Sequence, residues 1–282
     1  MNGYSKIKSF AKINLALNIV GKSFLIHKIE SIISFLSLSD EILIKEIDKK
    51  KHIIKFTGKF SKNIGKINTI SKLLKILDKK KILKDKKYEI KIKKNIPSKA
   101  GLGGGSMNAA SILKYLIKKN NIKISQKKIL EITNLVGSDV ILGMYSKNLI
   151  LKSNGVIHKI GALENRKVLI IKPNFGCSTK QIYSKVKKFK SSRFNNPKKK
   201  LFSYSQLKKM SNDLESIAFK IYPKLKTLKV FLEKLPNIKL VRMTGSGSAM
   251  IAYFSSSKLC KLAEKKVKKH FRKYWCKTAK TI

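Results

Sequence analysis

The sequence predicts an α+β fold divided into two domains. Its 282 residues exceed the size of one ordinary domain, and a hydrophobic content of 43% with 8% aromatic residues is enough to fill a core. Segments that alternate like strands and segments with the periodicity of helices follow one another irregularly. The break is expected near residues 160–167, which gives domains of residues 1–162 and 163–282.

The first domain is expected to mix strands, helices and one hairpin. Strands are predicted at residues 6–20, 29–47 (with a turn near Ser39 and Asp40), 51–56 and 88–92, and a hairpin at 148–160 that turns at Asn154–Gly155. Helices are predicted at residues 68–77, 106–119 and 127–136. The first helix has apolar residues at positions 70, 73, 74 and 77, which share one face. Ser125 is the expected N-cap of the third.

The second domain is expected to begin with a strand at residues 167–172 that ends at Pro173. Residues 185–200 are charged and polar, which is typical of an exposed loop. Helices are predicted at residues 201–222, 224–235 and 259–271, with Pro223 separating the first two. Strands are predicted at residues 240–243 and 249–254, on either side of a glycine-containing turn at 244–248.

The charge is strongly basic, because 65 Lys and Arg against 15 Asp and Glu give a net charge of +50. Nucleic-acid sites favour Arg, whose planar guanidinium pairs with phosphate and guanine through two hydrogen bonds. Only four of these basic residues are Arg, and the 61 Lys are spread among Ile and Asn, which share adenine- and thymine-rich codons. We therefore interpret the charge as a genomic bias at solvent-facing positions and expect no specific nucleic-acid partner.

The chain has no features of a secreted or membrane protein. Its cysteines, Cys177, Cys260 and Cys276, form no CxxC pair and no closed disulfide set, which favours inert thiols in a reducing compartment. Residues 1–20 lack the layout of a signal peptide. Uncharged runs such as residues 100–113 are shorter than the about 20 apolar residues that cross a bilayer. A cytoplasmic protein without membrane contact is expected.

Two of the few stretches that lack lysine contain clusters of glycine. One such stretch, residues 100–113, begins inside the segment 97–110. This segment reads P-S-K-A-G-L-G-G-G-S-M-N-A-A and lies between a predicted strand and a predicted helix. Glycines let the backbone present its N–H groups to a ligand, and a helix N-terminus adds partial positive charge. The segment therefore favours a phosphate cradle, with a structural turn as the alternative. A Walker loop is rejected because residues 16–23 read as an apolar strand, and a dinucleotide fingerprint because Ser106 stands where glycine is required.

Segment 97–110 resembles the second signature of the GHMP small-molecule kinases, a superfamily that includes galactokinase, homoserine kinase and mevalonate kinase. Further matches follow in the expected order: A-K-I-N-L at 11–15, G-S-D-V at 137–140, N-D-L-E at 212–215 and M-T-G-S-G-S at 243–248. The resemblance implies an N-terminal domain like the second domain of ribosomal protein S5 and a ferredoxin-like C-terminal domain. The first and third of these motifs are most similar to GHMP kinases of the non-mevalonate isoprenoid pathway, which phosphorylate the 2-hydroxyl of a cytidyl-diphospho sugar alcohol.

The resemblance implies catalytic roles for Lys12 and Asp139. Asp139 would accept the proton of the attacking hydroxyl, and Lys12 would orient Asp139 and offset charge on the transferred phosphoryl group. From the residues alone, Asp139 is equally compatible with a turn or helix cap, and Lys12 with a solvent-facing position. The residues expected to bind ATP are Pro97, Ser98, Lys99, Ala100, Gly101, Leu102, Gly103, Gly104, Gly105, Ser106 and Met107.

The resemblance also implies four substrate-binding residues, Asn14, His27, Thr179 and Tyr183. The family has a D-G-Y-H segment whose aromatic residue and His contact the cytosine. Here residues 23–27 read S-F-L-I-H, so His27 is retained and Ile26 replaces the tyrosine. Tyr183 is expected on the opposite face of the base.

ATP and Mg²⁺ are the implied cofactors, and the sequence assigns no metal ligands and no oligomeric state. The alternatives are another GHMP kinase, such as a homoserine kinase, and a basic RNA-binding protein, because the S5 fold also occurs in ribosomes. The second alternative requires aromatic residues interleaved with Arg, and the sequence lacks that pattern.

Overall fold

The computed structural model describes residues 3–24, 26–62, 64–145 and 147–282. It divides into two compact units, each made of several chain segments. Unit 1 comprises residues 1–11, 38–98 and 103–146, and unit 2 comprises residues 12–37, 99–102 and 147–282. Strands β1 (Ser5–Ser23) and β2 (Ile26–Ile47) contribute residues to both units. The boundary expected between residues 162 and 163 stays a prediction.

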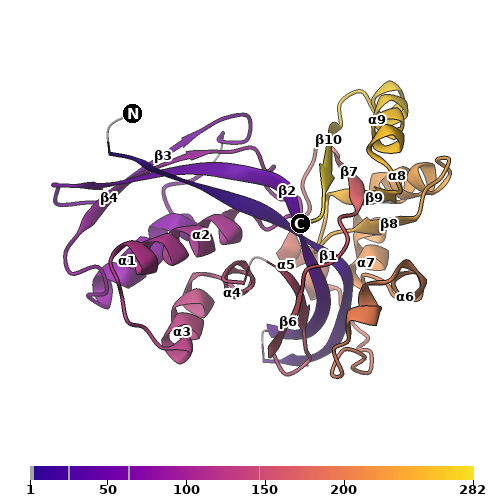
Figure 1. Cartoon of the computed structure of the whole chain (residues 1–282). Coiled ribbons are helices and arrows are strands. Elements are labelled where there is room, and N and C mark those ends of the chain that lie inside the picture. The colour runs from indigo at the N-terminus through magenta and orange to yellow at the C-terminus, as the bar shows by residue number, and fades with distance from the viewer. Residues whose placement is uncertain (1–2, 25, 63, 146) are drawn as a thin grey trace. The chain divides into compact units, whose positions relative to one another are not determined.

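Unit 1 packs helices against one face of a small sheet. Strand β4 (Lys87–Lys93) lies between β3 (Ile53–Thr57), which is parallel to it, and the antiparallel 41–47 part of β2. The helices are α1 (Thr69–Lys79), α2 (Gly104–Lys119), α3 (Gln126–Val136) and α4 (Val140–Gly143). Figure 1 shows α1, α2 and α3 on one side of this sheet. Their apolar faces meet in a core where Leu73, Ile90 and Leu113 are fully buried.

Local signals for the ends of the helices in unit 1 are confirmed. Ser125 caps α3, because its side chain accepts a hydrogen bond from the backbone N–H of Lys128. Asn68 caps α1 by accepting from the N–H groups of Ile70 and Ser71. Helix α2 begins at Gly104, two residues before the predicted start, because its glycines continue the helix into the Gly-rich segment.

Unit 2 contains a four-stranded antiparallel sheet. Its strands lie in the order β10 (Trp275–Lys280), β7 (Lys167–Lys172), β9 (Met250–Phe254) and β8 (Leu240–Met243). Between β7 and β8 come α5 (Thr179–Ser184), η1 (Lys199–Phe202), α6 (Tyr204–Lys208), α7 (Leu214–Ile221) and α8 (Pro223–Glu233), and α9 (Ser257–His270) joins β9 to β10. This β-α-β-β-α-β order with antiparallel pairing is the ferredoxin-like arrangement, and it confirms the prediction.

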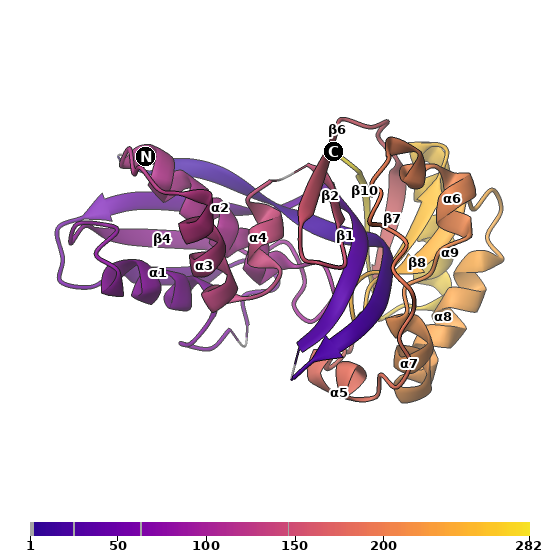
Figure 2. The ribbon, with the colours of Figure 1, turned by 90° about the horizontal axis from the view of Figure 1, so that it is seen from below.

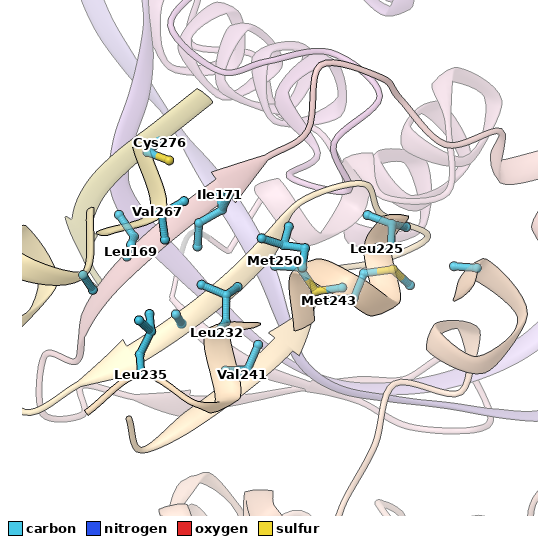
Figure 3. Close-up of a cluster of buried hydrophobic side chains, with 14 of the residues drawn as sticks. Leu169, Ile171, Leu225, Leu232, Leu235, Val241, Met243, Met250, Val267 and Cys276 are labelled. Atoms are coloured by element: carbon cyan, nitrogen blue, oxygen red, sulfur yellow. The ribbon is translucent and has the colours of Figure 1, made fainter. Parts of the chain in front are cut away.

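The core of unit 2 lies between this sheet and its helices. Figure 3 shows Leu169 and Ile171 of β7 and Met250 of β9 in the same cluster as Leu232 of α8 and Val267 of α9. All five side chains are fully buried, which removes their apolar surface from water. The hairpin expected at residues 148–160 is confirmed as β5 (Asn148–Leu151) and β6 (Ile157–Gly161), with β5 pairing to residues 31–33 of β2.

Two predictions about elements are wrong, and one strand was missed. Strand β2 runs through Ser39 and Asp40 without a turn. The helix expected at residues 201–222 is broken, because the backbone of residues 211–213 pairs with β1 through the N–H and carbonyl groups of Leu17. Strand β10 was not predicted. Cys276 is the only buried residue of this edge strand, so the sequence shows no apolar alternation there. Among the described residues, no helix has the length and apolarity needed to cross a bilayer.

Candidate active site

The Gly-rich segment places a helix N-terminus next to a left-handed glycine. Gly103 is the N-cap of α2, with φ of 68° and ψ of 15°. Because glycine has no side chain, it makes no capping hydrogen bond. Its carbonyl accepts the N–H of Met107 at 2.9 Å, so the N–H groups of Gly104, Gly105 and Ser106 have no acceptor within the helix. These N–H groups and the dipole of a 16-residue helix form an arrangement suited to anionic oxygens.

The glycines of α2 lie in tight contact with neighbouring residues of unit 1. A Cβ on Gly104 would lie 3.0 Å from Cγ2 of Ile96, and one on Gly105 would lie 3.2 Å from Oγ1 of Thr69. The hydroxyl of Thr69 also donates to the carbonyl of Gly105 at 3.0 Å. The first turn of α2 is therefore held against the end of β4 and the start of α1, with little space for side chains.

In unit 2, residues 99–101 of the segment pack against the second Gly-rich turn, residues 244–248. Gly101 has φ of +73°, and a Cβ there would lie 1.9 Å from the carbonyl oxygen of Thr244. The two segments are joined by hydrogen bonds from Thr244 Oγ1 to Gly101 O (3.2 Å), from Ser248 N to Lys99 O (3.3 Å) and from Ala249 N to Ala100 O (3.2 Å). The two Gly-rich segments therefore pack directly on each other.

A buried carboxylate in unit 1 holds both sides of the Gly-rich segment. Asp40, fully buried in β2, accepts hydrogen bonds from the backbone N–H groups of Asn95 (2.7 Å) and Ile96 (2.8 Å), just before the segment. It also accepts from Nδ2 of Asn108 in α2 (2.9 Å) and forms an ion pair with Lys94. The Lys94 ammonium lies next to the start of α2, since a Cβ on Gly104 would be 3.3 Å from it.

The sequence did not reveal this cluster, which we call the Asp40 cluster (Asp40, Lys94, Asn95, Ile96 and Asn108). Asp40 and Asn108 are 68 residues apart in the chain, so no local pattern connects them. One signal was present: Asp40 is one of only 15 acidic residues, and it stands in the middle of a long predicted strand. A carboxylate in that setting requires partners.

Lys12 is buried, which excludes the solvent-facing alternative. Lys12 is only 4% exposed, and its ammonium donates a hydrogen bond to Oδ1 of Asn14 at 2.9 Å. Alternation along β1 puts both side chains on one face of the strand. Asn14 is fixed in turn, because its Nδ2 donates to Ser31 Oγ at 2.8 Å and its backbone N–H donates to Thr244 Oγ1 at 3.1 Å.

Asp139 stands at the N-cap position of α4 but does not cap it. Its backbone has φ of −82° and ψ of −9°, and its side chain makes no capping hydrogen bond. The alternative of a side-chain helix cap is therefore excluded for Asp139. The residue is half-buried in unit 1, where the four-residue helix follows it directly.

The structure brings His27 and Tyr183 together in unit 2. Their ring centroids are 5.1 Å apart with an interplanar angle of 46°; Figure 2 shows the β1–β2 hairpin end near α5. Burial, helped by the charge of Lys22, lowers the pKa of His27 below 6.5, so the imidazole is neutral at pH 7. Thr179 lies elsewhere on α5, where its hydroxyl contacts Ser246 Oγ at 2.8 Å. The side chain of Ile26 lies outside the described residues.

The described residues contain no group of three or more His, Cys, Asp or Glu side chains arranged to hold a metal ion. The three cysteines are buried and unpaired in disulfides, and burial raises the pKa of the Cys177 thiol to about 11. Their thiols are therefore protonated and unreactive at neutral pH, as the sequence predicted.

Comparisons with known proteins agree with the geometry of the Gly-rich segment. Residues 68–147 match the model of the GHMP kinases N terminal domain. Over 282 residues and the full length of both chains, the sequence is 56% identical to the 4-diphosphocytidyl-2-C-methyl-D-erythritol kinase of Pelagibacter ubique. It is 32% identical to the protein of the same name from Fusobacterium nucleatum, over 90% of this chain and 89% of that one.

Solved structures of this fold are also similar. A crystal structure of 4-(cytidine 5'-diphospho)-2C-methyl-D-erythritol kinase superposes with a TM-score of 0.78 and 21% identity, covering 98% of this chain and 99% of that one. The homoserine kinase from Cytophaga hutchinsonii gives a TM-score of 0.73 with 16% identity, covering 100% and 95% of the two chains. At these identities the structures establish the fold.

Proposed function

The chain belongs to the 4-diphosphocytidyl-2-C-methyl-D-erythritol kinase family of the GHMP kinases, and from that membership we propose its reaction. The protein transfers the terminal phosphoryl group of ATP to the 2-hydroxyl of 4-diphosphocytidyl-2-C-methyl-D-erythritol, giving the 2-phosphate and ADP. This step belongs to the non-mevalonate route to isoprenoid precursors. The observation that carries the proposal is the 56% identity to a kinase of this name over the entire length of both chains.

The Gly-rich segment is the proposed site for the phosphates of ATP. The N–H groups of Gly104, Gly105 and Ser106 at the start of α2 fit this role, because they lack helical acceptors and point from the positive end of the helix. Backbone donors of this kind are already in place before ATP binds, so they bind the phosphates without further reorganisation. Of the other residues expected to contact ATP, Ser98 and Lys99 are exposed, whereas Ala100, Leu102 and Met107 are buried and could contribute backbone groups only.

Asp139 is the proposed general base, and Lys12 the proposed positioning cation. Phosphoryl transfer is catalysed mainly by positioning and by offsetting charge. The carboxylate of Asp139 does not cap α4, and a carboxylate is a group that can accept the proton of the substrate hydroxyl. The ammonium of Lys12 is buried and oriented by Asn14, so it can offset negative charge on the transferred group at low dielectric.

Mg²⁺ is part of the proposal as a partner of ATP. The described residues form no cluster of carboxylates that would enclose the ion, which fits a metal held mainly by phosphate oxygens and water, as Mg²⁺ usually is. When bound, Mg²⁺ supplies charge that offsets the phosphate oxygens.

His27, Tyr183, Asn14 and Thr179 are the proposed contacts of the organic substrate. His27 is neutral at pH 7 because its pKa is lowered, so its ring has both a donor and an acceptor nitrogen for the edge of a base. We also place the enzyme in the cytoplasm without a specific nucleic-acid partner, and with a small molecule as its partner.

A substrate panel tests the proposal. Purified protein with Mg-ATP is assayed for ADP release with the cytidyl substrate, homoserine and mevalonate at equal concentrations. We expect turnover with the cytidyl substrate alone. Faster turnover of homoserine would contradict the proposal and favour the homoserine kinase alternative.

A further inference from the structure

The segment between α5 and η1 is held in one place although it has no regular secondary structure. The carboxylate of Glu30, fully buried in β2, accepts hydrogen bonds from Ser192 Oγ (2.7 Å), Arg193 N (2.7 Å) and Phe194 N (3.0 Å). The same carboxylate also accepts a hydrogen bond from Nδ2 of Asn18 at 2.8 Å. Glu30 therefore anchors residues 192–194 to β1 and β2.

A second anchor lies two residues earlier. The backbone N–H of Lys190 donates to the carbonyl of Ile19 in β1 at 2.9 Å, and its ammonium donates to Ser211 Oγ at 3.0 Å. Lys190 also forms an ion pair with Asp213. The residue just before these anchors, Phe189, is consequently carried by a fixed backbone.

The two phenylalanines of this lysine-rich segment have opposite environments. Phe194 is fully buried, as expected for an apolar residue that helps to anchor the loop. Phe189, in contrast, is 47% exposed. Its ring centroid is 6.4 Å from that of His27 with an interplanar angle of 48°. Phe189 is thus an exposed ring presented next to a residue of the proposed substrate site.

Three rings from separate elements converge here: His27 from β2, Tyr183 from α5 and Phe189 from the anchored segment. His27 is tilted by 46° against Tyr183 and by 48° against Phe189, so neither of these two pairs closes into a flat stack. Aromatic faces left open in this way suit a planar heteroaromatic group.

We propose that Phe189 is a specificity-determining residue that offers an aromatic face to the cytosine of the substrate. The inference rests on the proposed function, because that substrate carries a cytidyl group. It also accounts for Ile26, the residue that stands where a stacking tyrosine was expected: the aromatic contact comes from another part of the chain. Glu30 acts as a positioning residue, since it fixes the loop that carries Phe189.

Steady-state kinetics of Phe189→Leu and Phe189→Tyr test the proposal. Leu keeps an apolar side chain but removes the ring, whereas Tyr keeps the ring. Stacking of a base on an aromatic residue contributes enough to predict a rise of about 10-fold in the KM for the cytidyl substrate in Phe189→Leu. We expect the KM for ATP to remain within about twofold, an effect too small for a lost contact of this kind, and Phe189→Tyr to behave like the wild type.

The matched control is Phe24→Leu. Phe24 is another exposed phenylalanine, which follows β1 and is 96% exposed, and we expect no change in either KM. Calorimetric titration with cytidine 5'-diphosphate provides a readout that does not depend on turnover. Its dissociation constant should rise in Phe189→Leu by about the same factor as the KM, because both report the same stacking contact.

Unchanged KM and unchanged cytidine diphosphate affinity in Phe189→Leu would overturn the proposal. Equal losses for ATP and for the cytidyl substrate, together with a lower melting temperature, would also overturn it by showing a structural role. If the wild type fails to phosphorylate the cytidyl substrate but its cytidine diphosphate affinity still depends on Phe189, the proposed reaction is wrong and the base contact stands.

Discussion

Removing the carboxylate of Asp40 should destabilise the protein strongly. The substitution Asp40→Ala strands the ammonium of Lys94, whose side chain is 5% exposed, and leaves the N–H groups of Asn95 and Ile96 without their acceptor. Breaking a buried ion pair by removing one partner costs about 3–5 kcal/mol. The predicted loss in the free energy of unfolding therefore lies in that range.

Urea unfolding followed by circular dichroism measures the loss, and the double variant Asp40→Ala/Lys94→Met is the matched control. Methionine removes the stranded charge while keeping most of the side-chain volume, so we expect the double variant to be more stable than Asp40→Ala by at least about 1 kcal/mol. ATP affinity of the folded single variant should also fall, because Asp40 holds residues on both sides of the Gly-rich segment. A loss below about 1 kcal/mol, well short of that expected for a broken buried pair, or a double variant no better than the single one, would refute this reasoning.

Three further predictions follow from the site and the fold. Gly104→Val should abolish ATP binding in calorimetry while the fold persists, because a branched side chain in the first turn of α2 would block the approach of the phosphates to the backbone N–H groups; unchanged affinity would remove the phosphate-cradle assignment. Asp139→Asn should lower kcat by about 10²–10⁴-fold, the usual contribution of a general base, with ATP still bound; a variant that keeps a tenth of the wild-type rate would make Asp139 structural. Burial lowers the pKa of His52 below 6.5, so the folded state binds fewer protons and the melting temperature should fall as the pH drops from about 6.5. His52→Asn, which keeps an acceptor for the N–H of Tyr88, should flatten that dependence, and an equally steep profile would assign it to other groups.

Elements with a strong local signal were predicted from the sequence. The helix at residues 68–77 and the hairpin at 148–160 appear as α1 and as β5 and β6, because apolar periodicity and a tight Asn-Gly turn act over short distances. The turn expected at Ser39–Asp40 failed because the donors that satisfy Asp40 come from the residues just after β4 and from α2, far away in the chain. Nothing in the residues around Asp40 reveals those donors.

The break in the helix at residues 201–222 has a similar cause. Asn212 donates through Nδ2 to the carbonyls of Met243 (2.9 Å) and Gly245 (2.7 Å), which ties this stretch to the second Gly-rich turn. Apolar spacing alone predicted a helix here, and tertiary hydrogen bonds override it. The N-D-L-E motif did mark the position, although the sequence alone did not say that its Asn is structural.

The sequence predicted the part of the site whose residues are contiguous in the chain. It missed the contacts that form only when distant segments come together in the fold. The Gly-rich segment at 97–107 stood out because glycine clusters are rare in a chain dominated by lysine. Lys12, Asp139 and His27 came from the family resemblance, since a single Lys, Asp or His carries no local signal of function. Glu30 and Phe189 were missed because their significance comes from contacts between β2 and residues 189–194.

The central claim, phosphorylation of the cytidyl substrate at its 2-hydroxyl, is tested most directly by identifying the product. Wild-type protein is incubated with Mg-ATP and 4-diphosphocytidyl-2-C-methyl-D-erythritol, and the mixture is followed by phosphorus NMR. We predict one new phosphomonoester signal, coupled to the C2 position of the erythritol, that grows in step with ADP. ADP formation without that signal, or a phosphate on a different hydroxyl, would contradict the account.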